Sequence, residues 1–329
     1  MKLPIGVVGV GHLGSLHTKM FSNIASAELV GVYDSDIRRA EKVAADYRTK
    51  AFPSLEVLFE NVKAVSIAAT TIAHYEVAKR AIDRGIHLFI EKPITHTTRQ
   101  AELLIDAAGK KNVLIQVGHI ERFNPALLAL ETYEIKPMFI ESHRLAQFNP
   151  RGTDVAVVLD LMIHDIDIIL SLVQSPVKSI EANGIAVISD NIDIANARLQ
   201  FENGCVANVT ASRISQKKMR KMRLFQRNAY ISIDFSDGSA EVFRLVDADE
   251  KVENLAMMLG QISAGTKNKN IVFERPVIKE VNSLKYELEL FVEAVLKNKQ
   301  PVVTGAEGLQ ALRVAHDIIE KINQQKISI

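Results

Sequence analysis

Residues 4–14 read PIGVVGVGHLG, an apolar run that ends in glycines spaced as G-x-G-x-x-G. The run predicts a strand buried on both faces of a parallel sheet, and apolar residues at helical spacing follow it. Between a strand and a helix, such glycines let the backbone approach a pyrophosphate, whereas a lone motif can be only a packing turn. We expect a dinucleotide site formed by Gly9, Gly11, His12, Leu13 and Gly14.

An acidic residue stands at the end of the second expected strand, ELVGVYD (28–34). Asp34 lies 20 residues beyond Gly14 and should accept hydrogen bonds from the adenosine ribose hydroxyls. Its charge would repel a 2′-phosphate, so NAD is favoured over NADP. Arg38 and Arg39 could reach such a phosphate, or they could be solvated charges on an exposed helix start.

Strands and helices alternate through the first part of the chain. Further strands are expected at 62–70, 87–93 and 113–119, with helices between them, including one at 98–111. This alternation predicts right-handed βαβ units on one parallel sheet. We therefore expect a doubly wound α/β Rossmann domain over residues 1–120.

The rest of the chain has a different period. Residues 194–212 alternate apolar and polar side chains around Asn203-Gly204, a strong hairpin signal, and residues 229–235 alternate too. Helical spacing returns at 284–295 and at 308–322. Residues 121–329 are thus predicted to form an α+β domain with a mostly antiparallel sheet, whose last helix could pack back on the first domain.

Composition narrows the class of protein. The 329 residues carry 40 basic and 39 acidic side chains, which gives no electrostatic case for nucleic acid or a membrane surface. Cys205 is the sole cysteine and can form no internal disulfide. The sequence has no run of about 20 apolar residues, and its first residues do not read as a signal peptide. A cytoplasmic location is expected.

Residues 89–96, FIEKPITH, end an apolar strand with paired charges. Ligands bind beyond the carboxyl ends of strands in doubly wound sheets, which is where Lys92 falls. Glu91 and Lys92 could be a solvated pair at a strand end. Alternatively, Lys92 is fixed by Pro93 at the place where a nicotinamide would lie.

Residues 157–170, VVLDLMIHDIDIIL, form an apolar helix pattern with a polar edge. Asp160 and His164 are four residues apart and share one helix face, whereas Asp165 and Asp167 project elsewhere. The pair could be a core histidine with its aspartate, or an acid/base group with a pKa near neutral. Two ligands without a third make a poor metal site, so no metal is expected.

Taken together, GVVGVGHLG, Asp34, AVSIAATTIAHYEVAKRAIDRGIHLFIEKP and Asp160-x-x-x-His164 resemble the Gfo/Idh/MocA oxidoreductases, named after glucose–fructose oxidoreductase and inositol dehydrogenase. The resemblance covers essentially the whole chain. It implies a Rossmann domain followed by a domain with an open sheet, whose free face commonly makes the subunit contact. A homodimer or homotetramer is therefore expected.

The resemblance also implies roles for individual residues. Lys92 would lie between nicotinamide and substrate and bond the reacting hydroxyl, with Glu91 orienting it. His164 would be the general acid/base, and Asp160 would orient the substrate. Thr70 and His74 match positions near the cofactor, although a polar residue at a helix start is an equal reading of His74.

Finer matches at VGHIERFNPA (117–126) and at 154–170 point to the branch that oxidises C3 of UDP-N-acetylglucosamine, whose keto product an aminotransferase consumes. The run RGTDVAVVLD departs from the glycine-rich stretch of many members, so contacts of the inositol and free-sugar branches are not carried over. The basic run KKMRKMR (217–223), with Arg122, could grip the diphosphate, or it could be a solvated strand edge. Dehydrogenation of a free sugar or cyclitol, a redox-cycling glycosidase reaction and a non-catalytic NAD-bound regulator are the alternatives.

Overall fold

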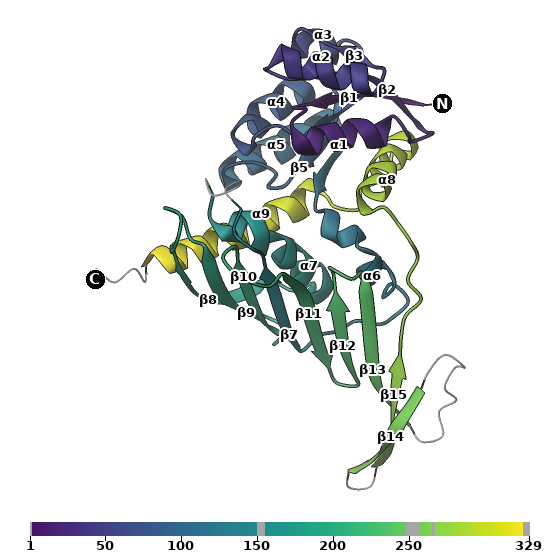
Figure 1. The fold of residues 1–329 in the computed structure, drawn as a ribbon, viewed down its shortest axis with the longest axis vertical. Coiled ribbons are helices and arrows are strands. Elements are labelled where there is room, and N and C mark those ends of the chain that lie inside the picture. Colours follow the sequence, from purple (N-terminus) through teal and green to yellow (C-terminus); the bar gives the residue numbers. More distant parts are fainter. Residues whose placement is uncertain (1, 150–154, 248–256, 265–266, 325–329) are drawn as a thin grey trace. The chain divides into compact units, whose positions relative to one another are not determined.

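The computed structural model describes residues 2–149, 155–247, 257–264 and 267–324 (Figure 1). The residues RGTD (151–154), which open the run noted above as a departure from relatives, lie outside the described residues. The chain divides into two compact units. Unit 1 contains Met1–Ile120 and Asn282–Arg313, and unit 2 contains Glu121–Val281 and Val314–Ile329.

Unit 1 is built on a parallel sheet. Its six described strands run in the order β3-β2-β1-β4-β5-β6, and every pair of neighbours is parallel. This order is that of dinucleotide-binding folds, so the Rossmann prediction is confirmed. The strands are β1 (Leu3–Val8), β2 (Ala27–Tyr33), β3 (Lys50–Ala51), β4 (Ala64–Ile67), β5 (His87–Glu91) and β6 (Ile115–Gly118).

The helices of unit 1 begin at recognisable caps. Thr97 forms a capping box with Gln100 at α5, and Asp36 caps α2 by accepting from two backbone N–H groups. The helices are α1 (His12–Phe21), α2 (Ile37–Asp46), α3 (Leu55–Phe59), α4 (Thr71–Asp83), α5 (Thr98–Lys111) and α8 (Ser283–Lys297). The division between the units falls within α9 (Gly305–Gln324).

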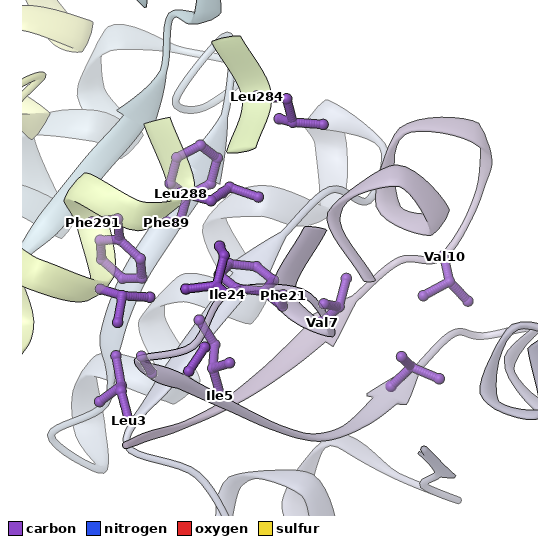
Figure 2. Close-up of a cluster of buried hydrophobic side chains, with 14 of the residues drawn as sticks. Leu3, Ile5, Val7, Val10, Phe21, Ile24, Phe89, Leu284, Leu288 and Phe291 are labelled. Atoms are coloured by element: carbon purple, nitrogen blue, oxygen red, sulfur yellow. The ribbon is translucent and has the colours of Figure 1, made fainter. Parts of the chain in front are cut away.

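A core of unit 1 joins the two ends of the sequence (Figure 2). Helix α8 packs against α1 and β1, and its Phe291 makes an edge-on contact with Phe89 at 5.8 Å between ring centroids. Residues 282–313, which the predicted boundary at 120 assigns to the second domain, group with unit 1. The residues drawn from both ends are Leu3, Ile5, Val7, Val10, Phe21, Ile24, Leu284, Leu288 and Phe291.

Unit 2 carries a second sheet of nine described strands, in the order β14-β15-β13-β12-β11-β7-β10-β9-β8. Only β7 and β10 pair in parallel within it, which confirms the mostly antiparallel prediction. The strands are β7 (Phe139–Leu145), β8 (Val177–Ile185), β9 (Ile194–Phe201), β10 (Val206–Ser212), β11 (Met219–Gln226), β12 (Ala229–Asp234), β13 (Ser239–Asp247), β14 (Met257–Ala264) and β15 (Lys267–Glu274).

Helical segments cover one face of this sheet. The described segments are the 3₁₀ turn η1 (Ile120–Phe123), α6 (Pro125–Leu128), the π-helical turn η2 (Val158–Met162) and α7 (Ile163–Val173). Helix α7 packs against β7 and β10. The side chains that face it, such as Ile140, Ala207 and Leu224, are fully buried, whereas alternate residues on the other face are partly exposed. Within the described ranges, no helix has the length and apolar character needed to cross a membrane.

Candidate active site

The glycine loop after β1 has the geometry of a phosphate-binding turn. Gly9 has φ +82°, and a Cβ there would lie 2.5 Å from the Cα of Ala69. A Cβ on Gly14 would lie 1.8 Å from the Gly9 carbonyl oxygen, so α1 can begin this close to the loop only with glycine. Around Gly11, by contrast, a Cβ would meet nothing within 4 Å, and no side chain caps α1. The backbone N–H groups there can therefore approach a bound anion.

Asp34 is fixed beside this loop. One carboxylate oxygen accepts from the backbone N–H of Val10 at 2.8 Å, and the other accepts from that of Asp36 at 2.9 Å. Arg39, whose side chain is half exposed, approaches the same carboxylate at 3.3 Å. The acid is buried and anchored where a ribose would follow the pyrophosphate, so the residues present fit a dinucleotide.

Thr70, His12 and Leu13 lie at the same sheet edge. His12 and Leu13 are exposed in the first turn of α1, and Thr70 is the exposed N-cap of α4, with no hydrogen bond from its side chain to that helix. Strands β1 and β4 are neighbours, and Gly9 packs on Ala69. The structure thus brings Thr70 close to the glycine loop.

Lys92 follows β5, the next strand of the sheet, and is half-buried. Its backbone N–H donates to the carboxylate of Glu91 at 3.2 Å. His74 bridges the two adjacent strand ends, since its Nδ1 lies 3.0 Å from the Pro93 carbonyl and its Nε2 lies 3.0 Å from the Ala69 carbonyl. Burial lowers the pKa of His74, although both carbonyl contacts oppose the shift. One buried ring therefore links the segment after β4, on which Gly9 packs, to the residue that follows Lys92.

A second buried histidine, which the sequence did not reveal, contacts the carboxylate of Glu91. His17 of α1 places Nε2 3.0 Å from a Glu91 oxygen and Nδ1 2.7 Å from the hydroxyl of Ser66 on β4. All three side chains are buried. The one available signal was position: His17 follows Gly14 by three residues, on the face of α1 that must pack on the sheet.

In unit 2, Asp160 and His164 straddle a change of helix type. Asp160 lies in the π-helical turn η2 and His164 in the first turn of α7, where one helix was predicted. Both residues are partly exposed, as are Leu159 and Leu161, whereas Met162 and Ile163 between them are buried. Single π turns inside helices occur frequently at functional sites.

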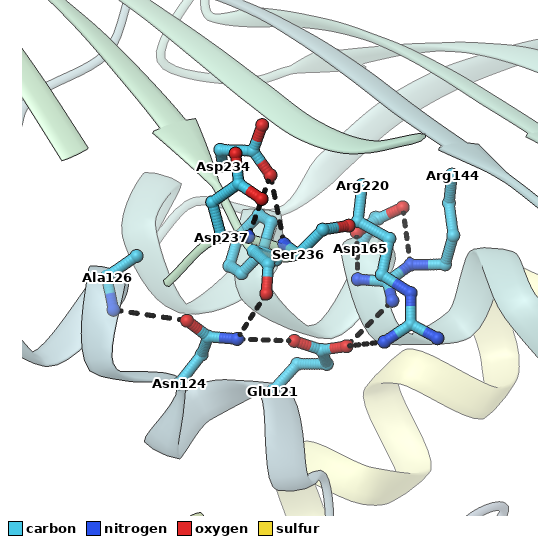
Figure 3. A network of polar contacts seen from close by, with 10 residues as sticks. Glu121, Asn124, Ala126, Arg144, Asp165, Arg220, Asp234, Ser236 and Asp237 are labelled. Atoms are coloured by element: carbon cyan, nitrogen blue, oxygen red, sulfur yellow. Dashed lines mark hydrogen bonds and ion pairs between the residues drawn. The ribbon is translucent and has the colours of Figure 1, made fainter. Parts of the chain in front are cut away.

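Two arginines fix α7 next to His164. Arg144 of β7 donates to Asp165 at 2.8 and 3.1 Å and to Glu121 at 2.8 Å, within the network of Figure 3. Burial lowers the pKa of Arg144, but Asp165 and Glu121 outweigh it and raise that pKa above its usual range, so the guanidinium stays charged. Arg122 donates to both oxygens of Asp167 at 2.7 and 2.8 Å.

The basic run 217–223 is largely matched by acids. On β11, Arg220 lies 3.5 Å from Glu121, within the same network (Figure 3). On the opposite face, Lys221 lies 3.0 Å from Asp234 and Arg223 lies 3.4 Å from a carboxylate of β7. Most of the charge excess that marked the run in the sequence is therefore offset locally, and Lys217 is an exposed cation before the strand.

Comparison with known proteins agrees with this geometry. Residues 3–119 match the oxidoreductase family with an NAD-binding Rossmann fold, and residues 140–241 match the GFO/IDH/MocA C-terminal domain.

The chain belongs to the Gfo/Idh/MocA oxidoreductase family.

Relatives of this Gfo/Idh/MocA protein include sugar-nucleotide and cyclitol enzymes. A UDP-N-acetylglucosamine 3-dehydrogenase of Acidithiobacillus ferrooxidans is 40% identical over 239 residues, 72% of this chain and 76% of that protein. A solved structure of that enzyme superposes with a TM-score of 0.88 at 33% identity, over 98% of this chain and 99% of the other. A scyllo-inositol 2-dehydrogenase (NAD(+)) of Bacillus subtilis is 28% identical, over 64% of this chain and 67% of that protein.

Family membership confirms two sequence-based predictions: the protein is an oxidoreductase, and its cofactor is NAD. In unit 1, the structure brings together the glycine loop, Asp34, Thr70, His74, Glu91 and Lys92, and in unit 2 it places Arg122, Asp160 and His164 on or beside one helical segment. Among the described residues, no group of three or more His, Cys, Asp or Glu side chains could hold a metal ion.

Proposed function

We propose that this oxidoreductase transfers a hydride to NAD from a sugar secondary alcohol, namely C3 of UDP-N-acetylglucosamine, to give the 3-keto sugar nucleotide. The observation that carries the proposal is the likeness over 98% of the chain, with a TM-score of 0.88, to a structure of an enzyme named for this reaction. Lys92 at the strand edge that carries the NAD fingerprint supports the reaction class, because a cation there can stabilise a developing alkoxide.

The proposed role of each residue is set by the hydride, the proton or the negative charge that moves during the reaction. When bound, nicotinamide supplies the hydride acceptor at its C4 atom. Lys92 donates a hydrogen bond to the reacting oxygen and stabilises its negative charge, and Glu91 orients that lysine. His164 takes the hydroxyl proton as the C–H hydrogen leaves with its electron pair, so that an alcohol becomes a ketone. Asp160 orients the substrate.

Cofactor contacts are proposed for the loop and strand ends of unit 1. Backbone N–H groups at Gly11, His12 and Leu13 hold the pyrophosphate, and Asp34 accepts from the ribose hydroxyls. The carboxylate of Asp34 disfavours the 2′-phosphate of NADP. Thr70 offers its hydroxyl at the same edge.

For Arg122, two roles compete. A substrate contact was predicted, but its guanidinium makes two hydrogen bonds to Asp167, which favours a role in fixing α7. We propose that role, with Lys217 and Arg220 as the remaining candidates for a diphosphate contact. If Lys217→Ala and Arg220→Ala leave the KM for UDP-N-acetylglucosamine unchanged, the basic run does not grip the diphosphate.

Self-association is proposed through the open face of the sheet in unit 2. A row of rings crosses five strands there, with neighbouring centroids 4.9 to 5.8 Å apart, and charges of both signs lie beside it. Such a partly exposed aromatic surface suits a second copy of the chain in a homodimer or homotetramer. The rings belong to Phe139, Phe225, Tyr230, Phe243 and Phe273.

A second candidate is oxidation of a free sugar or cyclitol, which the 28% identical inositol dehydrogenase favours. A non-catalytic NAD-bound regulator is the third, and the joint presence of Lys92, Asp160 and His164 argues against it. A 3-keto sugar is a substrate for amination, so coupling to an aminotransferase fits the first candidate.

The test uses stoichiometric protein and NAD with UDP-N-acetylglucosamine, its uronic acid or myo-inositol, and follows the absorbance of reduced nicotinamide. An aminotransferase with glutamate removes the ketone and draws the reaction forward. A signal with UDP-N-acetylglucosamine alone, abolished by Lys92→Ala, is expected. A signal with inositol alone contradicts the substrate, and NAD binding without turnover of any compound favours the regulator.

A further inference from the structure

Two buried histidines of unit 1 converge on the segment Glu91-Lys92-Pro93 from opposite sides. His17 reaches the side chain before Lys92, and His74 reaches the carbonyl after it. Neither ring is accessible to solvent. Each ring has a polar atom within 3.0 Å of each nitrogen, as a buried imidazole requires, and for each ring one of those atoms belongs to Glu91 or Pro93, on either side of Lys92.

The contacts at His17 form a directed chain. Nε2 of His17 makes an ion-pair contact with a Glu91 oxygen at 3.0 Å, and a carboxylate can only accept. This contact favours the tautomer with its proton on Nε2, which leaves Nδ1 to accept from the Ser66 hydroxyl at 2.7 Å. The other oxygen of Glu91 accepts from the backbone N–H of Lys92. These contacts connect Ser66 of β4 to His17, His17 to Glu91, and Glu91 to the main chain of Lys92.

Gly118 of β6 leaves the space that the Glu91 carboxylate occupies. Gly118 of β6 pairs with Glu91, and a Cβ on it would lie 2.9 Å from the Glu91 carboxyl carbon. The carboxylate is therefore enclosed by β6 and by His17. It cannot swing toward solvent without leaving both.

The contacts at His74 act on the other side of Lys92. Both nitrogens of His74 face carbonyl oxygens, which only accept, so the neutral ring donates to one carbonyl and the protonated ring to both. Of the two, the bond to Pro93 restrains the peptide that follows Lys92. The contact with Ala69 ties the same ring to the segment after β4, on which Gly9 packs.

We propose that His17 and His74 are positioning residues that hold the main chain of Lys92 through Glu91 and Pro93, respectively. The inference rests on the role proposed above for Lys92. A displacement of about 1 Å at a reacting group can lower turnover on the order of 100-fold, so these contacts matter although neither ring touches substrate.

Two amide substitutions test the two ring nitrogens one at a time. Glutamine places its amide nitrogen near the position of histidine Nε2, and asparagine places its own near that of Nδ1. His17→Gln keeps the donor to Glu91, and His17→Asn keeps only the side toward Ser66. At His74 the order reverses, since asparagine keeps Pro93 and glutamine keeps only Ala69. We expect kcat on the order of 10- to 100-fold lower in His17→Asn and His74→Gln than in their partners, with the Kd for NAD within about threefold of wild type.

His87→Gln is the matched control. His87 lies on the same strand, four residues before Glu91, and its ring accepts a backbone bond from Leu114 without touching the Lys92 segment. Its kcat should equal that of wild type. The proposal is overturned if kcat falls equally in the glutamine and asparagine variants at each position, or if the same amide gives the larger loss at both positions. It is also overturned if kcat falls as far in His87→Gln as in His17→Asn. Ser66→Ala, which removes only a hydroxyl, replaces His17→Asn if the latter does not fold and should lower kcat in the same direction.

A readout that needs no turnover separates this inference from the proposed function. Trace acetylation with acetic anhydride, quantified by mass spectrometry, measures the reactivity of the Lys92 amine against exposed Lys110. The ratio should change severalfold in His17→Asn and His74→Gln, and stay unchanged in His87→Gln. If Lys92→Ala keeps full turnover, the proposed function fails, but an altered ratio still supports the positioning. An unaltered ratio in both variants refutes it.

Discussion

The Arg122–Asp167 pair offers a measurable test of how unit 2 holds its helix. The two side chains are 12% and 1% exposed, and the fork geometry gives contacts of 2.7 and 2.8 Å. Removal of one partner from a buried pair leaves an uncompensated charge and costs about 3–5 kcal/mol. Arg122→Ala should therefore lower the free energy of unfolding by roughly that amount, and a double-mutant cycle with Asp167→Ala should give a coupling on the order of 3 kcal/mol.

Denaturant unfolding supplies the four free energies of each cycle, followed through the transition of unit 2 for Arg122–Asp167 and through that of unit 1 for the control pair. The control pair is Lys110–Asp106, which is as short, at 2.6 Å, but 73% and 63% exposed, so its coupling should stay below about 0.5 kcal/mol. A coupling under about 1 kcal/mol for Arg122–Asp167 would refute the argument from burial. If Arg122 instead binds the diphosphate, Arg122→Ala raises the KM for UDP-N-acetylglucosamine and Asp167→Ala does not.

Four further outcomes are expected. Asp34→Ser removes the charge that repels a 2′-phosphate, and the ratio of kcat/KM for NADP to that for NAD should rise on the order of 100-fold; no change assigns selectivity elsewhere. Gly14→Ala forces a Cβ to 1.8 Å from a carbonyl oxygen and should abolish NAD binding in calorimetry while unit 2 stays folded, and retained affinity contradicts the close approach. Burial raises the pKa of Asp193, but three backbone N–H groups and a hydroxyl overcome it and hold that pKa well below its usual range. A carboxyl group with a depressed pKa stabilises the fold above about pH 4, and this stabilisation is lost as the pH falls further. Asp193→Asn should therefore flatten the acid side of a plot of the unfolding midpoint against pH, and an unchanged slope would contradict the prediction. Phe225→Lys should weaken self-association in light scattering, whereas Leu103→Lys, on a residue of similar exposure (40% against 38%), should not; equal effects count against the ring surface.

Local signals in the sequence predicted much of unit 1. The apolar run before Gly9, the helical spacing after it and the acid at position 34 each depend on neighbours within about 30 residues, and the observed sheet agrees with the parallel βαβ arrangement that they predict. The same holds for the hairpin at Asn203-Gly204, where Gly204 has φ +87°. The spacing of apolar residues and the turn residues are local properties of the sequence, so a single sequence is enough to predict these elements.

Contacts between distant segments could not be predicted in this way. The spacing of Leu284, Leu288 and Phe291 shows that α8 has an apolar face, but not that α1 and β1 cover it. Likewise, a histidine such as His17 has no periodicity that marks it as buried beside an acid from another strand. The pairing of Arg122 with Asp167 joins residues 45 positions apart, so the sequence did not reveal that a residue predicted to contact substrate has an ion-pair partner.

The core of unit 1 also has a consequence for the order in which the chain can fold. During synthesis, β1 and α1 emerge before α8, which covers them and follows only after the whole of Glu121–Val281. Until then the apolar face around Leu3, Ile5 and Phe21 has no partner from the end of the chain. The packing of β1 and α1 is thus completed only once α8 has been synthesised, and a fragment cut after residue 120 would leave that face open to aggregation.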